Sequence, residues 1–211
     1  MGGARWLLVA AGKLPNREIW QPLVTSADKI IAVDGGGNIC SANNIDFDLI
    51  IGDLDSLDQS SISNFDDGKI HELSSQSESD LVKALNWCAE NNCRHVDVVG
   101  IEGGRTDHKL AAFASLFEAP EELSVELHLS DCIAFIAPSM RELPVMKGQK
   151  VAFFAIGGNV ENLTLSGFEY ELHDERLNFS SRAISNTAVN DHPRVEYSPT
   201  STGRLLAMIF Y

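Results

Sequence analysis

Four short segments in the first 110 residues combine acidic side chains with glycine or serine. They read DGGGN at 34–38, GDLDS at 52–56, QSESD at 76–80 and GGRTDH at 103–108. Glycines let backbone N–H groups approach an anionic ligand closely, and carboxylates are favoured ligands of Mg²⁺. Each segment alone would also suit a tight turn or the first turn of a helix. Together they indicate a site where a metal ion holds a phosphate.

The second segment carries a pair of carboxylates with the spacing of a metal site. Asp53 and Asp55 follow an apolar run and are separated by one residue, so both can reach one hard cation. Crowding two like charges costs free energy unless a cation or hydrogen bonds offset the repulsion. The alternative is a turn in which Asp55 or Ser56 caps the next helix. The pattern favours metal binding, because Asp53 has no such capping role.

The other segments add groups suited to a nucleotide. Arg105 suits a phosphate clamp, and Asp107 suits metal binding or proton acceptance. Asp80 in the third segment would also gain from the positive end of a helix dipole. The first segment is not G-x-G-x-x-G, and no P-loop lysine follows it. The sequence therefore predicts a Mg²⁺–nucleotide site that uses carboxylates in place of a P-loop lysine.

The elements that must position these segments alternate between strands and helices. Short apolar runs predict strands over 6–11, 29–33, 49–51 and 96–99. Helical spacing predicts helices from Asp80 and Thr106, with Ser79 and Thr106 as N-caps. Their expected core-facing stripes are Leu81, Ala84, Leu85 and Cys88, and Leu110, Phe113, Ala114 and Phe117. This alternation predicts a Rossmann-like α/β domain with a mainly parallel sheet, whose ligands bind outside the carboxyl ends of the strands.

After about residue 120 the pattern changes to short strands separated by turn residues. The strands are expected over 125–129, 133–137, 151–156, 160–165, 182–185, 194–197 and 205–210. The first of them is compatible with the α/β sheet, and the rest predict an antiparallel β-sandwich. We place the boundary near residue 130, which gives an α/β domain over 1–130 and a β-sandwich over 131–211.

Composition excludes several classes of function. The 211 residues carry a net charge of −14, which disfavours general binding to nucleic acid or to an anionic membrane surface. No apolar run approaches the roughly 20 residues of a membrane helix. The four cysteines form no C-x-x-C pair, which is typical of reduced thiols in a cytoplasmic protein. The apolar N-terminal run is better explained by a buried strand than by a signal peptide.

The order of the four segments resembles the thiamine pyrophosphokinase family. The C-terminal half adds Ile184-Ser185-Asn186 and a closing strand over 203–207, which are also similar to that family. The resemblance implies an α/β domain that binds ATP and Mg²⁺, and a β-sandwich that binds thiamine. It also implies a homodimer with active sites at the subunit interface. The implied reaction moves pyrophosphate from ATP to the thiamine hydroxyl, giving thiamine diphosphate and AMP.

The resemblance also implies a role for individual residues. The expected catalytic residues are Asp53, Asp55, Asp80 and Asp107, of which the first three would hold Mg²⁺ and either of the last two would accept the proton. The expected nucleotide contacts are Asp34, Gly35, Gly36, Asn38 and Arg105. The expected substrate contacts are Gln76, Ser79, Ser185 and Asn186. Two positions depart from the family pattern: Ser77-Glu78 stands where Lys-Asp is frequent, and Tyr170 stands where Trp is frequent, with packing in the sandwich expected over stacking on thiamine.

Three other functions remain open on the sequence. A related pyrophosphokinase could act on a hydroxymethyl pterin, although the Ser185-Asn186 element favours thiamine. The Asp53-Leu54-Asp55 spacing also occurs as the D-x-D motif of nucleotide-sugar transferases. A non-catalytic protein that binds thiamine or a nucleotide would carry the same domains without turnover.

Overall fold

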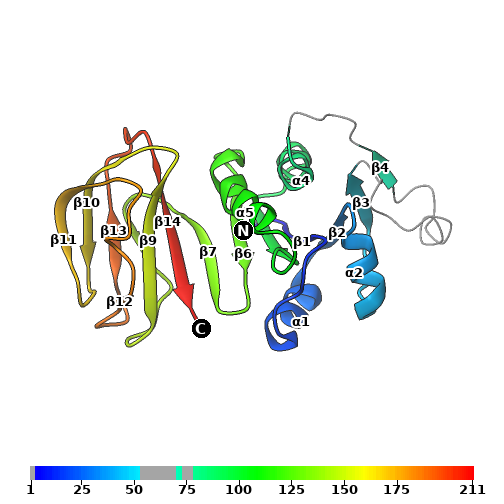
Figure 1. Ribbon diagram of the computed structural model, residues 1–211, viewed down its shortest axis with the longest axis horizontal. Coiled ribbons are helices and arrows are strands. Elements are labelled where there is room, and N and C mark those ends of the chain that lie inside the picture. The colour runs from blue at the N-terminus through cyan, green and yellow to red at the C-terminus, as the bar shows by residue number, and fades with distance from the viewer. Residues whose placement is uncertain (1–2, 53–69, 73–77) are drawn as a thin grey trace. The chain divides into compact units, whose positions relative to one another are not determined.

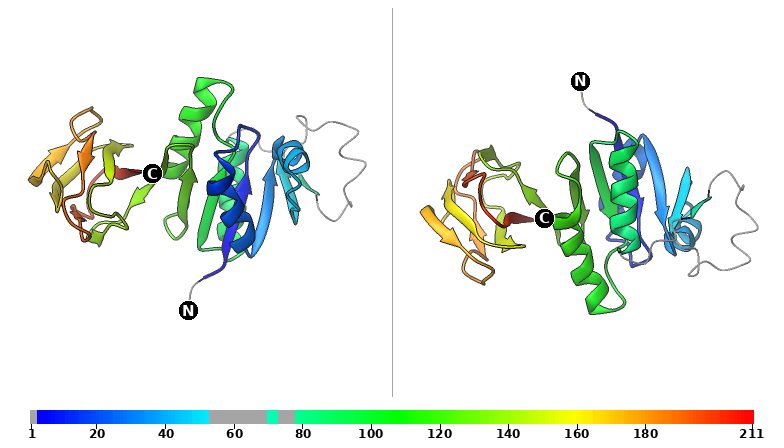
Figure 2. Two further views of the ribbon diagram at one scale, coloured as in Figure 1. Left: turned by 90° about the horizontal axis from the view of Figure 1, so that it is seen from below. Right: turned by 90° about the horizontal axis from the view of Figure 1, so that it is seen from above.

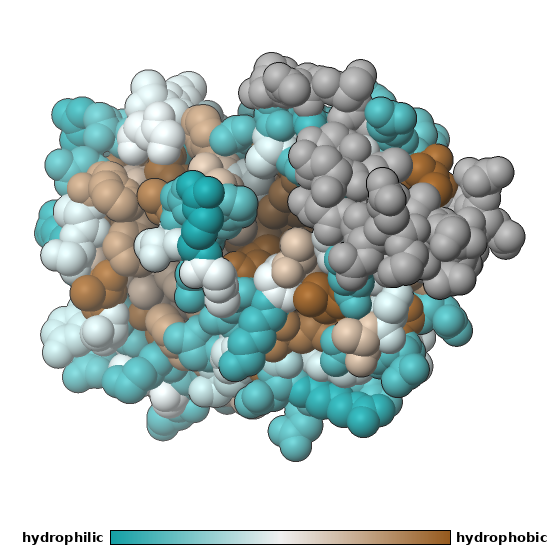
Figure 3. Space-filling model, turned by 45° about the vertical axis from the view of Figure 1, so that its right-hand side comes forward, coloured by the Kyte–Doolittle hydropathy of each residue, from teal (hydrophilic) through white to brown (hydrophobic). Residues whose placement is uncertain are grey.

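The computed structural model describes residues 3–52, 70–72 and 78–211, and the chain divides into two compact units, Met1–Ser130 and Asp131–Tyr211 (Figure 1). No helix among the described residues is long and apolar enough to cross a membrane. On the face drawn in Figure 3, hydrophobic residues form separate groups among hydrophilic ones. Each unit has its own hydrophobic core.

The first unit is built on a parallel sheet with the strand order β6-β5-β1-β2-β3-β4. The strands are β1 (Arg5–Val9), β2 (Lys29–Val33), β3 (Leu49–Gly52), β4 (Ile70–Glu72), β5 (His95–Val99) and β6 (Ser124–His128). Four consecutive residues of β1, Trp6 to Val9, are buried, as expected of a strand covered on both faces. The predicted fold class of this half is therefore confirmed, including the placement of β6 in the α/β sheet.

Helices cover both faces of this sheet, and side-chain alternation along β1 shows how. The helices are α1 (Arg17–Ser26), α2 (Gly36–Asn43), α4 (Asp80–Glu90) and α5 (Thr106–Glu118). Leu7 packs in one core cluster with Trp20 of α1, whereas the neighbouring Trp6 lies against Trp87 of α4, with ring centroids 5.7 Å apart. Helices α1 and α4 consequently lie on opposite faces, as the two views of Figure 2 show.

Helix α4 begins where the sequence predicts. Ser79 is its N-cap, and the Ser79 hydroxyl accepts a hydrogen bond from Val82 N at 3.3 Å. Ala84, Leu85 and Cys88 of the predicted stripe are buried. The cap is thus confirmed, and so are three of the four predicted core residues; Leu81 is half-buried.

Helix α5 differs from its prediction in two respects. Arg105 occupies the N-cap position and makes no side-chain cap, so the assignment of Thr106 as the cap was wrong. The buried residues are Ala112, Ser115 and Leu116, whereas Leu110 is 69% exposed. The predicted core-facing stripe was therefore wrong: helical spacing selected the more apolar side chains, whereas the buried face includes Ala112 and the polar Ser115.

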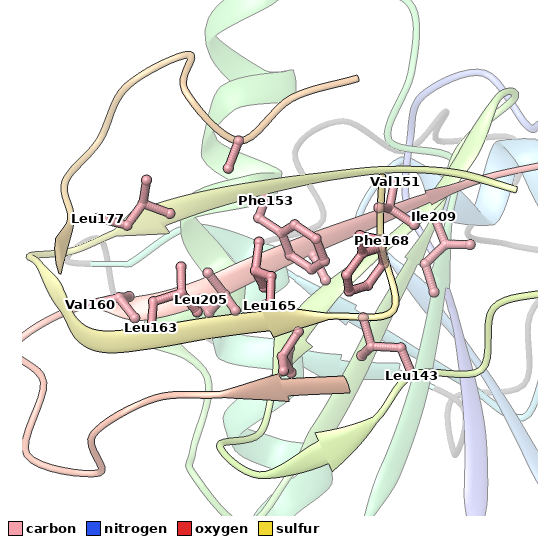
Figure 4. Close-up of a cluster of buried hydrophobic side chains, with 14 of the residues drawn as sticks. Leu143, Val151, Phe153, Val160, Leu163, Leu165, Phe168, Leu177, Leu205 and Ile209 are labelled. Atoms are coloured by element: carbon pink, nitrogen blue, oxygen red, sulfur yellow. The ribbon is translucent and has the colours of Figure 1, made fainter. Parts of the chain in front are cut away.

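The second unit consists of antiparallel strands in two layers. One layer has the order β12-β9-β14-β7 and the other β11-β10-β13-β8. Their bounds are β7 (Cys132–Ala137), β8 (Arg141–Glu142), β9 (Lys150–Ile156), β10 (Val160–Ser166), β11 (Leu172–Leu177), β12 (Asn186–Thr187), β13 (Arg194–Glu196) and β14 (Arg204–Phe210). Phe153, Leu205, Leu163 and Leu165 from the two layers are fully buried in one apolar core (Figure 4). The predicted β-sandwich is confirmed.

Four segments of this unit differ from the prediction: the strands β8, β11 and β12 were not predicted, and one predicted strand is absent. The strand predicted over 182–185 is absent: this segment forms a turn followed by a bend, and Ser185 has a left-handed φ of 57°. Strand β11 was missed because its sequence, LHDERL, is largely charged and exposed at a sheet edge.

Candidate functional site

The loops that follow β1 and β5 are joined by main-chain hydrogen bonds at the carboxyl edge of the parallel sheet. Gly12 N donates to Gly100 O at 2.6 Å, and Lys13 N donates to Glu102 O at 2.5 Å. A Cβ atom on Gly12 would lie 2.5 Å from both acceptor oxygens. Only glycine therefore permits this approach, and the two loops form one continuous wall of the edge.

The glycine-rich segment after β2 lies against the same edge. Asp34 N donates to Ile51 O at 2.8 Å, which ties the segment to β3. Helix α2 begins at Gly36, where a Cβ atom would lie 1.9 Å from Val9 O. The helix can start this close to β1 only because the residue is glycine. The first and fourth acidic segments are thus placed at one edge, with the β1 loop between them.

Asp34 has a carboxylate oxygen that needs a partner. Its backbone has a φ of 46°, and its Oδ1 atom is buried without a hydrogen-bond donor among the residues that the structure describes. A buried carboxylate oxygen without a donor or a cation is costly. Asp34 is therefore suited to a ligand that supplies positive charge or an N–H or O–H group.

Arg105 and Asp107 form an exposed ion pair at the start of α5. Arg105 Nε and Nη2 lie 3.1 and 2.6 Å from the two carboxylate oxygens of Asp107. This hydrogen bonding lowers the pKa of Asp107 and raises the pKa of Arg105. A carboxylate with a lowered pKa and both oxygens engaged is a weaker proton acceptor. The pair therefore favours a role for Asp107 in restraining Arg105.

The residues at the start of α4 are also partly engaged. Asp80 is the first residue of the helix, and its Oδ1 accepts from Lys83 Nζ at 2.9 Å. Lys83 is only 8% exposed, so this oxygen of Asp80 accepts its hydrogen bond from a buried donor. Ser79, a predicted substrate contact, uses its hydroxyl as the helix cap. A substrate contact by Ser79 would have to share that hydroxyl.

Glu102 was missed by the sequence reasoning and positions the β5 loop. Its carboxylate accepts hydrogen bonds from Ser130 N at 2.6 Å and Ser130 Oγ at 2.5 Å, and it pairs with Lys109 at 3.5 Å. Burial alone would raise the pKa of Glu102, but these donors outweigh it and lower the pKa. Its location between a strand and two glycines was the signal that could have identified it.

Another group of potential metal ligands lies in the sheet. Asp97, Glu126 and His128 place their ligand atoms within 4.8 Å of one another. The Arg5 guanidinium, however, already contacts Asp97 at 2.5 and 2.6 Å and Glu126 at 3.2 Å, and His128 Nε2 donates to Asp97 at 2.7 Å. A fixed cation therefore occupies the position a metal would take, and the group is a structural ion-pair network.

In the second unit, Asn186 fixes the main chain of Tyr170. Asn186 is 2% exposed; its Oδ1 accepts from Tyr170 N at 3.0 Å and its Nδ2 donates to Tyr170 O at 2.7 Å. Tyr170 itself is 64% exposed, so the expectation that it packs in the sandwich was wrong. The amide of Asn186 presents this ring to solvent, and Ser185 next to it is also exposed.

The predicted site residues that the structure describes fall into three groups. Asp34, Gly35, Gly36, Asn38, Arg105 and Asp107 lie in the segments after β2 and β5 and in the first turns of α2 and α5 that follow them. Ser79 and Asp80 start α4, and Ser185 and Asn186 belong to the second unit. The predicted residues Asp53, Asp55 and Gln76 lie outside the described residues.

Comparisons with known proteins agree with this architecture. The family described as "Thiamin pyrophosphokinase, catalytic domain" matches residues 20–128, and "Thiamin pyrophosphokinase, vitamin B1 binding domain" matches residues 139–200. A curated thiamine pyrophosphokinase of Bacillus subtilis (strain 168) is 27% identical over 126 residues. That match spans 57% of this chain and 58% of the relative, which is less than two thirds of its length.

Solved structures share the fold across nearly the whole chain. The crystal structure of thiamine pyrophosphokinase from Bacillus subtilis gives a TM-score of 0.77 at 21% identity, over 97% of this chain and 98% of that one. Yeast thiamin pyrophosphokinase gives 0.79 at 15% identity, over 100% of this chain and 87% of that one.

The fold and the edge loops define a two-domain protein with a parallel α/β unit, whose carboxyl edge carries the candidate site, and a β-sandwich. The family match covers more than half of the residues. The chain belongs to the thiamin pyrophosphokinase family.

Proposed function

We propose that the protein transfers a pyrophosphoryl group from ATP to the hydroxyl of thiamine, releasing thiamine diphosphate and AMP. The observation that carries the proposal is the joined edge of the α/β unit, where glycine loops, Arg105 and an oxygen of Asp34 without a donor among the described residues lie outside parallel strands. Thiamine oxygen forms a bond to the β-phosphorus, and the bond from that phosphorus to the α,β-bridging oxygen breaks. The electron pair leaves with AMP.

The donor set of the α/β unit fits Mg²⁺. The buried Oδ1 of Asp34, which accepts no hydrogen bond from the described residues, supports this proposal because Mg²⁺ prefers carboxylate oxygens. The proposed ligands are Asp53, Asp55 and Asp80. When bound, Mg²⁺ would supply charge neutralisation for the phosphates.

Side chains of the protein would bind the phosphates and accept the proton. Arg105 is the proposed phosphate clamp, since a guanidinium binds phosphate oxygens through two parallel N–H donors. The proton of the thiamine hydroxyl would pass to Asp80 or Asp107. Arg105 engages both oxygens of Asp107, and Lys83 contacts one oxygen of Asp80, whose other oxygen is the proposed Mg²⁺ ligand.

The β-sandwich is the proposed source of thiamine contacts. Tyr170 offers an exposed aromatic face on a main chain fixed by Asn186. Aromatic faces attract cations, and the thiazolium ring is cationic. A protein with a net charge of −14 also attracts a cationic substrate.

We further propose that the protein acts as a cytoplasmic homodimer. The four cysteines, all in the described part of the chain, form no disulfide with one another, which suits a reducing compartment. Sedimentation equilibrium of the purified chain would test the dimer, and a mass near 23.0 kDa would exclude it.

The test is an AMP-release assay with ATP, Mg²⁺ and thiamine, in which the product mass is determined. We expect thiamine-dependent AMP and thiamine diphosphate, and no turnover with UDP-sugars. Asp53→Ala and Asp55→Ala should abolish turnover and leave the fold intact. AMP release with a pterin alcohol but not with thiamine would refute thiamine as the acceptor and identify the pterin instead. Thiamine binding without any turnover would refute the enzymatic proposal.

A further inference from the structure

The loop after β1 lies at the point where the strand order of the parallel sheet reverses. From β1 the chain adds β2, β3 and β4 on one side, and β5 and β6 then follow on the other side of β1. In open α/β sheets, ligands bind outside the carboxyl ends of the strands at such a reversal. Lys13 is the basic residue of this loop and stands three residues before Asn16, the N-cap of α1.

The backbone of Lys13 is fixed at this position. Ala10 N donates to Val99 O at 2.9 Å, and Lys13 pairs with Glu102 in an isolated antiparallel bridge. A Cβ atom on Gly103 would lie 3.2 Å from Lys13 Cβ. The Lys13 side chain therefore starts directly over the glycine loop that leads to Arg105.

The charge of Lys13 is not neutralised by the residues that the structure describes. Its side chain is exposed and takes part in no ion pair with them, whereas other basic groups near the edge are paired. The nearest acidic residue on the facing loop, Glu102, directs its carboxylate to Ser130 and Lys109.

We propose that Lys13 binds the polyphosphate of the nucleoside triphosphate, together with Arg105. This inference rests on the proposed function and extends it to the β1 loop. The ammonium group of a lysine is a compact charge on a flexible four-carbon stem. It can therefore contact phosphate oxygens at several different positions. Charge-assisted hydrogen bonds of this kind are about twice as strong as neutral ones. Lys13 is accordingly a determinant of ATP affinity and not of thiamine affinity.

The experiment compares Lys13→Met with Lys13→Arg and with Lys147→Met, which removes an exposed lysine of the second unit. Calorimetry measures the Kd of the Mg²⁺ complex of α,β-methylene-ATP, and steady-state assays measure KM for ATP and for thiamine. We expect Lys13→Met to weaken analogue binding and raise the KM for ATP by about 10- to 100-fold. The KM for thiamine should change less than about twofold, Lys13→Arg should recover most of the affinity, and Lys147→Met should match the wild type.

The outcomes distinguish a failure of the Lys13 assignment from a failure of the proposed function. Wild-type affinity for the analogue in Lys13→Met would overturn the assignment of Lys13 and leave the proposed function standing. Equal rises in both KM values would overturn it as well, since they indicate a structural effect. No binding of the analogue by the wild type would overturn both proposals. Circular dichroism of each variant checks folding, and Lys13→Gln replaces Lys13→Met if the latter is unfolded.

Discussion

The replacement Asp97→Asn should destabilise the α/β unit through the ion-pair network in its sheet. Asp97 is 2% exposed and accepts hydrogen bonds from Arg5 and His128. Burial would raise the pKa of Asp97, but His128 and Arg5 together outweigh burial and lower it. The carboxylate is thus charged and fully engaged in the folded state, and its amide variant leaves both donors facing a group that cannot neutralise them.

The size of the effect follows from the exposure of each partner. Removing one partner of a buried ion pair costs about 3–5 kcal/mol. The Arg5 side chain is 43% exposed and can recover hydration, so we expect about 3 kcal/mol, at the lower end of that range. With a urea dependence of about 2 kcal/mol per molar, the unfolding midpoint should fall by about 1.5 M.

Tryptophan fluorescence is a selective assay for this unit. All three tryptophans, Trp6, Trp20 and Trp87, belong to the first unit, so their emission reports its unfolding alone. The matched control is Glu126→Gln, a carboxylate of the same network whose side chain is 37% exposed, and it should cost less than about 1 kcal/mol. A midpoint for Asp97→Asn within about 0.3 M of the wild type would refute the reasoning.

The same variant should alter the dependence of stability on pH. Because folding lowers the pKa of Asp97, the unfolded chain binds a proton more readily. The stability from this group is therefore present above an unfolded-state pKa of about 3.9 and is lost as the pH falls through the lower folded value. Urea midpoints measured in acid should show this loss in the wild type, and Asp97→Asn should lack it.

Three further predictions concern other parts of the chain. Gly36→Ala should weaken binding of the ATP analogue at least about tenfold, measured by calorimetry, because its Cβ would lie 1.9 Å from Val9 O. Asn186→Ala should raise the KM for thiamine about tenfold and leave the KM for ATP unchanged in steady-state assays, since Tyr170 loses its main-chain anchor. Native protein should react with less than about one equivalent of a disulfide reagent at pH 8, because all four thiols are buried and burial raises the pKa of Cys40 to about 12.

The buried strands of the α/β unit could be predicted because their sequences are nearly continuous apolar runs. Helices α1 and α2 could not, for local reasons. Helix α1 contains Pro22, and α2 begins with two glycines, which are poor helix formers. Packing of Trp20 and Cys40 against the sheet holds these helices in place, and this tertiary contribution has no signature in a short window of sequence.

The candidate site could be predicted where acidic residues and glycines coincide, as in the segments after β2 and β5. The loop after β1 was missed because residues 10–16 carry no carboxylate. Its importance depends on the reversal of strand order, and only the position of β5 beside β1 reveals this. The positioning roles of Glu102 and Asn186 depend on partners that are 28 and 16 residues away in the chain.

The joined edge loops have a consequence for how such a protein diverges. The bonds from Gly12 N to Gly100 O and from Lys13 N to Glu102 O use atoms that every residue except proline possesses. Side chains along these loops can therefore be exchanged by neutral drift while the scaffold keeps its shape. Purifying selection on the scaffold needs to act only on the few glycines at which an added Cβ atom would collide with main-chain atoms. A lineage could acquire a lysine such as Lys13, or lose it, and retune nucleotide affinity without rebuilding the site.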